Sequence, residues 1–504
     1  MLHALRQLLT GQRRKPSAPR RHDGAIARRV VRARYDAAQS SDNSRRHWAL
    51  ADGLSARAAN TTEVRRTLRN RSRYEVANNS YAKGIVLTLA NDVIGTGPRL
   101  QMLGLSVSDN RRIEREFATW ARTVGLADQL RTLRIARAQD GESFAVLTDN
   151  PVLPTPVTLD LRLLEAEQVT TPDLVALREQ QAVDGLRFDR WGNVVEYHVL
   201  REHPGAQIAI GATAYDRIPA GAMIHDFRAE RPGQARGIPE ITPALPLFAM
   251  LRDYSLATLD AAKAAAYFAG ILYTDSPANG EAEGVEPMDA IELERNMLLT
   301  MPGGWKLGQV RAEHPTASYG EFKREILNEI ARCLNMPFNI AAGNSSGYNY
   351  ASGRLDHQTY FKAIRVDQSH IESVILDRIF AAWVREAVLI EGYLPQRLRL
   401  TTTDWSHQWF WDGSEHVDPA KEASAQATRL SNHTTTLADE YAKRGQDWET
   451  QLRQRAKEHE LMNELGLTAA AATPAAAPAA ETDDDAEPAE EADTRDEESA
   501  DARE

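Results

Sequence analysis

The sequence has few of the residues and runs that mark secreted or membrane-spanning proteins. Of its 504 residues only Cys333 is a cysteine, which excludes an intramolecular disulfide framework and favours a reducing compartment. The longest uncharged apolar stretches, 244–251 and 264–273, fall well short of the roughly 18 residues that a membrane span needs. The basic N-terminus lacks the uninterrupted apolar core and small-residue cleavage site of a signal peptide. We therefore expect no disulfide, no signal peptide and no contact with a membrane.

A basic excess is also missing from the body of the chain. The net charge of −11 arises entirely in residues 481–504, which hold thirteen acidic and two basic side chains, while the other 480 residues balance at 58 against 58. A domain that grips nucleic acid usually has a pI above about 9. Residues 1–34 are the local exception, with ten basic side chains against Asp23 alone. This arm could bind nucleic acid or an acidic partner such as a scaffold, or it could remain solvated.

Signatures of catalysis and of cofactor binding are absent. Gly343–Gly347 lacks the Lys-Ser/Thr of a P-loop, and Gly95–Gly97 follows a helical pattern where a strand is required. The sequence has no HExxH motif and no Gly-x-Ser-x-Gly elbow between a strand and a helix, and Cys333 lies on the apolar face of a helical pattern. Two acid–histidine neighbours occur in a Trp-rich segment, where packing explains them better: Asp404 with His407, and Glu415 with His416. We therefore predict a non-enzyme without catalytic residues, metal ligands or cofactors.

Periodicity predicts a mainly helical α+β fold. Helical spacing extends over 62–93, 108–123, 126–138, 242–270, 321–335, 355–391, 420–443 and 448–465. Short strand patterns occupy 144–147, 157–163, 186–188, 194–200, 223–227 and 297–299, and the turn residues 189–193 predict a hairpin. Residues 1–50 read as a basic arm. An Ala/Pro linker and the acidic tail fill 468–504, where apolar content is too low to offset the entropy of ordering.

The segment 223–241 joins a strand to the long helical pattern at 242–270 through a tight turn. Arg231-Pro232-Gly233 breaks the strand and Arg236-Gly237 follows it, so these residues turn and pack without offering chemistry. Elsewhere Arg131, Arg134 and Arg137 fall at i, i+3 and i+6 of one helical face and, with Lys263, could face DNA phosphates. For any one such stripe, a solvated or salt-bridged helix face is the simpler interpretation.

The amino-acid sequence of 223–241 resembles the corresponding segment of portal proteins of lambda-like tailed bacteriophages. In that family a basic-acidic-basic-Pro-Gly-Gln turn precedes Arg-Gly and a hydrophobic residue. Similar blocks recur in order at 34–38 with Trp48, at 69–84, at 251–266 and at 348–354. The C-terminal blocks include Gly445-Gln446-Asp447-Trp448 and a motif formed by Trp411, Asp418, Pro419, Lys421 and Glu422. Together these blocks cover about residues 32–467, and their order and spacing carry the resemblance.

The resemblance implies a ring homo-oligomer, usually a dodecamer in the virion, at one capsid vertex and assembled in the host cytoplasm. Double-stranded DNA would pass through its channel without sequence preference during packaging and ejection. The implied protein partners are the terminase large subunit, the major capsid and scaffold proteins, and head-completion or tail-connector proteins. Two other classes stay open: a DNA-processing enzyme, against which the missing metal carboxylate cluster speaks, and a monomeric DNA-binding adaptor that uses the basic arm.

The family architecture also assigns a role to each part of the chain. It implies an N-terminal wing part at 51–107, a stem helix region at 108–142, a β-rich clip at 143–235, a second stem helix at 236–272, a tunnel loop with wing residues at 273–320, wing and crown helices at 321–396, and a C-terminal Trp-rich segment with helices at 397–467. The clip–stem hinge would consist of Arg231, Pro232, Gly233, Arg236 and Gly237. Gly237→Val is then expected to disturb ring assembly before it disturbs stability.

Overall fold

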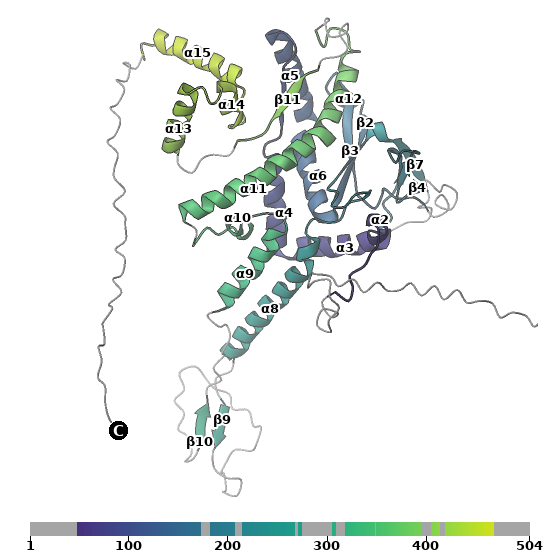
Figure 1. Ribbon diagram of the computed structural model, residues 1–504, viewed down its shortest axis with the longest axis vertical. Coiled ribbons are helices and arrows are strands. Elements are labelled where there is room, and N and C mark those ends of the chain that lie inside the picture. The colour runs from purple at the N-terminus through teal and green to yellow at the C-terminus, as the bar shows by residue number, and fades with distance from the viewer. Residues whose placement is uncertain are drawn as a thin grey trace, which may run out of the picture. The chain divides into compact units, whose positions relative to one another are not determined.

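The computed structural model describes residues 48–172, 182–206, 214–267, 271–274, 305–308, 318–347, 349–395, 405–413 and 419–467. The chain divides into two compact units, residues 1–59 and 60–504. The described part of the first unit contains the short helix α2 (Ala56–Ala59), and every element below belongs to the second unit (Figure 1). Most of the basic arm and all of the acidic tail lie outside the described residues. Among the described helices, none combines the length and apolarity needed to cross a bilayer.

The first helical stretch is broken where a single helix over 62–93 was expected. α3 (Thr62–Asn78) ends at Asn79, whose extended backbone (φ −120°) starts α4 (Ser80–Ile94) in a new direction. The Asn79 side chain accepts hydrogen bonds from the backbone N–H groups of Tyr81 (3.0 Å) and Ala82 (3.4 Å). An asparagine that caps the next helix therefore overrides the continuous helical periodicity.

The next two helices lie close to the predicted positions. α5 (Val107–Thr123) starts at the N-cap Ser106, and α6 (Leu126–Asp140) lies between two glycines with left-handed backbones, Gly125 (φ 66°) and Gly141 (φ 92°). Trp120 of α5 is fully buried, and its indole N–H donates to the Leu159 carbonyl at 2.8 Å. The helical face predicted for 108–123 is thus confirmed as a core face.

The β-rich region forms two antiparallel sheets. The three-stranded sheet has the order β3 (Leu159–Leu164), β2 (Glu142–Asp149), β8 (Met223–Phe227). The four-stranded sheet has the order β4 (Ala182–Val183), β5 (Leu186–Phe188), β6 (Val194–Leu200), β7 (Tyr215–Pro219). The strands predicted at 186–188, 194–200 and 223–227 are confirmed to the residue. The predicted hairpin at 189–193 is confirmed as well: Asp189 accepts from the backbone N–H of Asn193 at 2.8 Å, and Gly192 takes φ 87°.

Strand β2 is buried on both faces. Ala145 belongs to the large hydrophobic core that also contains Trp120 and other helix residues, whereas Phe144 and Val146 belong to a second cluster with Tyr197 of β6. Because side chains alternate along a strand, β2 separates these two cores. The β-rich region therefore shares its interior with the helices.

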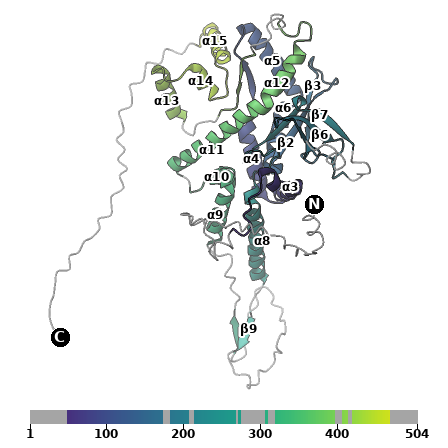
Figure 2. The same ribbon diagram turned by 45° about the vertical axis from the view of Figure 1, so that its right-hand side comes forward.

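The long helix after the turn is α8 (Leu245–Tyr267), preceded by a 3-10 turn at Thr242–Ala244. α8 packs along α9 (Ser318–Arg332), and Figures 1 and 2 show the two helices side by side. In the chain between them lie β9 (Ile271–Thr274) and β10 (Trp305–Gly308), which pair antiparallel. The strand expected at 297–299 lies outside the described residues. α8 also packs against α3, where Arg252 donates to the Glu75 carboxylate at 2.7 and 2.8 Å.

The helix expected over 355–391 is present with one irregular turn. α10 (Phe338–Ala342) is followed by α11 (Tyr350–Ile371), a π-helical turn at Glu372–Leu376, and α12 (Asp377–Ala387). A stripe along this stretch is almost fully buried and consists of Ile371, Ile375, Ile379 and Trp383. The extra residue per turn in the π-helical segment shifts that stripe without ending the helix.

The C-terminal part contains a strand that pairs with the first described strand of the chain. β11 (His407–Phe410) pairs antiparallel with β1 (Arg99–Met102), and Arg99 lies opposite Phe410. Three helices follow: α13 (Pro419–Ser431), α14 (Leu437–Ala442) and α15 (Trp448–Glu464). The single helix expected over 420–443 is divided, because Thr436 and Asp439 form a capping box that starts α14.

Candidate functional site

The 231–234 segment is the tight turn that the sequence predicted. The backbone N–H of Gln234 donates to the Arg231 carbonyl at 3.2 Å, with Pro232 and Gly233 (φ 78°) at the two central positions. Proline followed by a glycine with positive φ is the pattern of a type II turn. The Gln234 side chain closes the turn, since its oxygen accepts from the backbone N–H of Glu230 at 3.0 Å. Arg231, Pro232 and Gly233 are all exposed.

Gly237 lies in close contact with the corner between α6 and β2. A Cβ atom at Gly237 would lie 2.0 Å from the Gly141 carbonyl oxygen, and a Cβ at Gly141 would lie 2.3 Å from the Ile238 carbonyl carbon. Both obstacles are backbone atoms, so a side chain at either glycine must displace the chain itself. The expectation that Gly237→Val disturbs assembly before stability is therefore wrong, because the fold of the subunit depends on this contact.

Glu142, the first residue of β2, is the centre of a buried ion-pair network. Arg236 donates to it through Nε (2.8 Å) and Nη2 (2.7 Å), Arg69 through Nη2 (3.3 Å), and the Gly237 backbone N–H donates at 3.0 Å. His225 Nε2 lies 3.2 Å from the same carboxylate. Arg236 thus ties the turn segment to β2 and, through Glu142, to Arg69 of α3.

Arg134 and Arg137 lie in a second buried network. Arg134 contacts Glu240 (2.9 Å) and Asp367 (2.7 Å), and Arg137 contacts Glu240 (3.2 Å), Asp367 (2.9 Å) and Asp226 (3.3 Å). Both arginines are only 4% exposed. A buried guanidinium needs paired carboxylates, and these two have them within the subunit. The prediction that Arg134 and Arg137 face DNA is therefore wrong, and the salt-bridged interpretation of this stripe is the correct one.

The electrostatics of both networks follow from burial and opposite charge. Burial opposes the ionisation of Glu142, but Arg236 and His225 outweigh it and hold the pKa of Glu142 well below its usual range. Burial likewise opposes ionisation of Glu240, where Arg134 and Arg137 outweigh it and lower the pKa. Burial dominates at His225 and lowers its pKa despite the neighbouring Glu142. The carboxylates are charged partners of the arginines, while the buried imidazole favours its neutral form.

These networks join elements that are far apart in the sequence. Arg236 and Glu142 are 94 residues apart, and Arg134 and Asp367 are 233 apart. Glu142 and Glu240 were not predicted as site residues from the sequence. The sequence does place both glutamates next to an apolar strand or helix pattern. Charged residues are common at the ends of such elements, so this position alone does not identify a buried ion pair. What the arrangement provides is a rigid junction between the helices, the three-stranded sheet and the turn before α8.

Two features of the described residues could in principle carry chemistry, a thiol and a cluster of possible metal ligands, and both are held by contacts within the fold. Burial raises the pKa of the Cys333 thiol to about 11, and its Sγ lies 3.0 Å from the Glu240 carbonyl oxygen, so it is a poor nucleophile. Among the described residues one cluster, Glu165, Glu167 and His203, has the spacing of metal ligands. Arg69 and Arg73 lie 3.1 and 3.0 Å from the Glu167 carboxylate. Two guanidinium groups beside that carboxylate disfavour a bound cation.

The C-terminal motif fastens the Trp-rich segment to the body. The Trp411 indole N–H donates to Glu372 in the π-helical turn at 2.6 Å. Asp412 accepts from the Thr96 hydroxyl and from Arg99 Nη2, each at 2.8 Å, and from the Thr96 backbone N–H. A Cβ at Gly413 would lie 2.3 Å from the Lys443 carbonyl oxygen. Trp411-Asp412-Gly413 is therefore a structural clasp between the body and the C-terminal helices.

The other candidate residues take individual positions. Pro419 begins α13, Glu422 pairs with Arg429 at 2.7 Å, Lys421 is exposed, and Asp418 lies outside the described residues. Of the cations proposed to face DNA, Arg131 pairs with Asp128 and donates to the Gly95 carbonyl at 2.6 Å, and Lys263 lies 3.4 Å from Asp260 with 56% of its side chain exposed.

The network and clasp residues bind one another and connect distant parts of the fold. The sequence profile of the phage portal protein family described as the lambda family matches residues 42–368. This chain belongs to the lambda family of phage portal proteins.

Individual relatives agree with this assignment. The chain is 25% identical over 492 residues to a probable portal protein of Halomonas phage phiHAP-1, with 91% of this chain and 92% of that relative covered. It is 20% identical over 440 residues to portal protein B of Escherichia phage lambda, with 76% and 81% covered. Among solved structures, it is similar to a chain from the neck of a native GTA particle computed with C12 symmetry, at 13% identity and a TM-score of 0.46, with 80% of this chain and 98% of that chain covered.

Proposed function

We propose that this chain forms a homo-oligomeric ring, a dodecamer in the virion, at one capsid vertex, through which double-stranded DNA is packaged and ejected. The terminase large subunit docks on the ring during packaging, the major capsid and scaffold proteins surround it during assembly in the host cytoplasm, and head-completion or tail-connector proteins bind it afterwards. The observation that carries the proposal is the match to the phage portal protein family over residues 42–368.

The charge distribution supports a conduit for DNA. Double-stranded DNA carries one negative charge per about 1.7 Å of its axis, so a strongly basic channel would retain a strand that must slide. The body of this chain is charge-balanced outside residues 481–504. Arg134 and Arg137 form ion pairs with carboxylates inside the subunit, so they are not available to bind phosphate. Arg131 and Lys263 remain the candidates for contact with DNA.

Within this proposal we assign the projecting stem and clip to α8, α9 and the β9–β10 strand pair. These two helices pack side by side and are consecutive in the chain apart from a segment that contains the β9–β10 pair. A helix pair with a strand pair between its ends is suited to project from a body. The region 143–235, to which the sequence analysis assigned the clip, shares its core with the main helices, so we assign it to the wing.

Native mass spectrometry and electron microscopy of the purified chain test the proposal. A closed ring of about twelve times the 56.0 kDa subunit mass supports it, whereas a monomer or dimer with nuclease activity contradicts it and favours the DNA-processing enzyme. The ten basic side chains in residues 1–34 are the specific observation that favours a DNA-binding adaptor. That function requires DNA affinity to collapse when residues 1–34 are removed from a subunit that remains folded and monomeric.

A further inference from the structure

Helix α9 presents a face of carboxylates that have no ion-pair partner in the described part of the chain. Glu321, Glu325 and Glu329 follow one another at every fourth residue and are all exposed. The helix also carries Lys323, Arg324 and Arg332, so α9 as a whole is charge-balanced, and the three glutamates are spaced along one side of it. The contrast with the buried networks is sharp, because there every described carboxylate is matched by an arginine. Glu325 and Glu329 lie at the groove between α8 and α9, where both line its wall.

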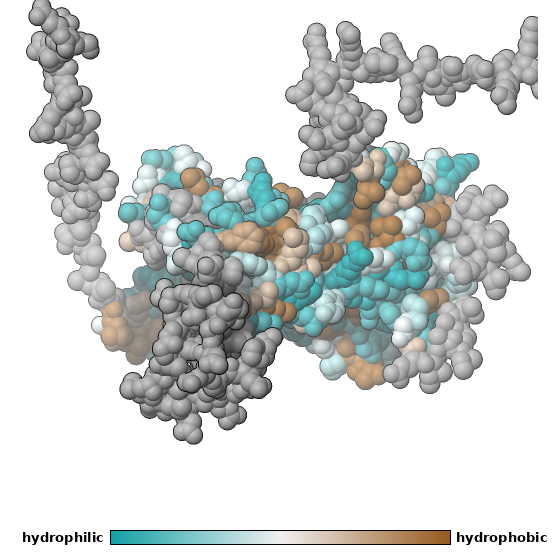
Figure 3. Space-filling view, turned by 90° about the horizontal axis from the view of Figure 1, so that it is seen from below, coloured by the Kyte–Doolittle hydropathy of each residue, from teal (hydrophilic) through white to brown (hydrophobic). Residues whose placement is uncertain are grey.

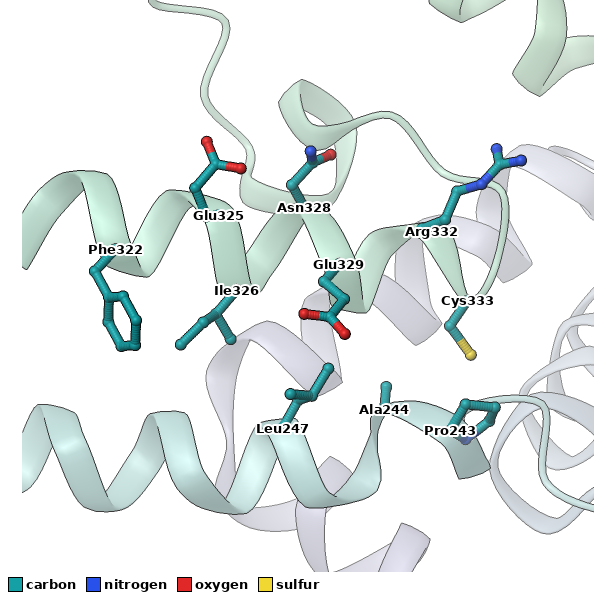
Figure 4. Close-up of a pocket in the computed structure, with 10 residues that line it drawn as sticks. All are labelled: Pro243, Ala244, Leu247, Phe322, Glu325, Ile326, Asn328, Glu329, Arg332 and Cys333. Carbon is teal, nitrogen blue, oxygen red and sulfur yellow. The ribbon is translucent and has the colours of Figure 1, made fainter. Parts of the chain in front are cut away.

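An apolar groove runs beside this acidic stripe. It has a volume of about 680 Å³. Its apolar lining comes from Pro243, Ala244 and Leu247 on one side and from Phe322, Ile326 and Cys333 on the α9 side, and its polar rim from Glu325, Asn328, Glu329 and Arg332. Figure 4 shows Phe322, Ile326, Glu329 and Cys333 directed toward α8, whereas Glu325, Asn328 and Arg332 point away from it. Phe322 is 51% exposed although it is a large aromatic side chain.

Helix α11 presents a face of the opposite sign. Arg354, Lys362 and Arg365 are exposed and, within the described residues, have no ion-pair partner. Leu355 and Val366 lie next to them on the helical wheel, and each is 66% exposed. At 1.5 Å per residue the 11 residues between Leu355 and Val366 span about 16 Å, which is also the distance along α9 from Phe322 to the position of Cys333.

We propose that α11 of one copy packs along the α8–α9 groove of the next copy in the ring, with Leu355 and Val366 over the apolar groove and the α11 cations against the acidic stripe. This inference rests on the proposed function, since it names the subunit contact of the ring. Two different surfaces of one chain meet in it, and a heterologous contact of this kind is what closes identical subunits into a ring. Complementary charges fix the register and exclude other pairings.

The pattern favours a second protein copy over DNA as the occupant of the α11 face. Phosphate contacts require cations and polar groups and do not bury leucine or valine side chains. Exposed apolar side chains rimmed by charge are typical of protein interfaces. Seen from below, brown hydrophobic groups interrupt the hydrophilic surface of the described residues (Figure 3). A contact with a neighbouring copy would cover exposed apolar residues of both helices.

Charge exchange across the contact is the decisive test. Lys362→Glu/Arg365→Glu and Glu325→Lys/Glu329→Lys should each raise the subunit concentration at which rings are half-assembled by at least about tenfold, because like charges then meet across the contact. The chain that carries all four substitutions should regain the ring, since opposite charges meet again. Native mass spectrometry counts the subunits, and circular dichroism confirms that each variant is folded. Any variant that unfolds is replaced by its glutamine counterpart.

The control is Arg453→Glu/Lys457→Glu, which reverses two exposed cations on α15, outside both faces. It should leave the ring intact. The inference is overturned if either reversed pair assembles like the wild type, if the fourfold variant fails to recover, or if the control loses the ring equally. Loss of DNA retention with an intact ring in Lys362→Glu/Arg365→Glu would assign the α11 face to DNA and overturn it as well. A wild-type chain that remains monomeric would refute the proposed function itself.

Discussion

The buried network around Glu142 makes a quantitative prediction about stability. Glu142→Gln keeps the size of the side chain but removes the charge that Arg236 and Arg69 share, and the carboxylate is 1% exposed in the wild type. Removing one partner of a buried ion pair costs about 3–5 kcal/mol, because the other charge is then buried without compensation. We expect a loss in this range in the free energy of unfolding of the subunit.

Equilibrium urea unfolding followed by tryptophan fluorescence measures this loss. Asp260→Asn is the matched control: it removes a carboxylate from an exposed pair with Lys263, and it should change the free energy of unfolding by about 0–1 kcal/mol. Arg236→Met combined with Glu142→Gln should cost less than the sum of the single changes by at least about 0.5 kcal/mol, because the two side chains interact directly. A Glu142→Gln subunit as stable as the control would refute the reasoning that the network holds this junction together.

Three further predictions follow from the same structure. Gly237→Val should abolish soluble folded subunit, because its Cβ would meet backbone 2.0 Å away, whereas Gly233→Ala, in open space at φ 78°, should cost about 1 kcal/mol; similar melting temperatures for the two would contradict this. Stability should fall as the pH drops below about 6.5, because burial lowers the pKa of His225 and the unfolded chain therefore binds a proton that the folded chain does not. Stability should fall further below about 4.5, because the pKa values of Glu142 and Glu240 are depressed in the fold and the unfolded chain takes up protons first. Melting temperatures between about pH 7.5 and about pH 4 test this, and a flat profile would be inconsistent with it. Trp411→Phe removes a hydrogen bond to the Glu372 carboxylate and should cost about 1.5–3 kcal/mol, with faster proteolytic release of the C-terminal helices; an unchanged cleavage rate would count against the clasp.

Element positions could be predicted from the sequence where local patterning decides them. The strands 186–188, 194–200 and 223–227 were predicted to the residue, because alternation and flanking turn residues specify them. The errors at Asn79 and at Thr436 share one cause. In both places a side-chain cap starts a new helix inside a stretch that the helical spacing joined into one, and spacing alone cannot register a change of direction.

The site is harder to predict than the elements, because its defining property is not local. Arg131, Arg134 and Arg137 have the same spacing, and the sequence gives no reason to separate them. In the fold the first lies at the surface, and the other two are buried beside Glu240 and Asp367, which are 103 and more than 200 residues away in the chain. Whether an arginine binds an internal carboxylate or an external phosphate is decided by which distant segment packs on it.

The same physics separates the two kinds of charged stripe in this chain. Guanidinium groups that point inward need carboxylates supplied by the same subunit, since an unpaired buried charge is too costly to fold around. Charges that stay outside and unmatched cost the folded monomer almost nothing, so nothing within the subunit requires the acidic face of α9 or the basic face of α11. The apolar and charged residues on the α9 and α11 faces complement each other. The proposed contact between neighbouring copies in the ring explains this complementarity. Of all the charged residues in the described part of the chain, those that lack a partner within the subunit are the ones from which assembly can be inferred.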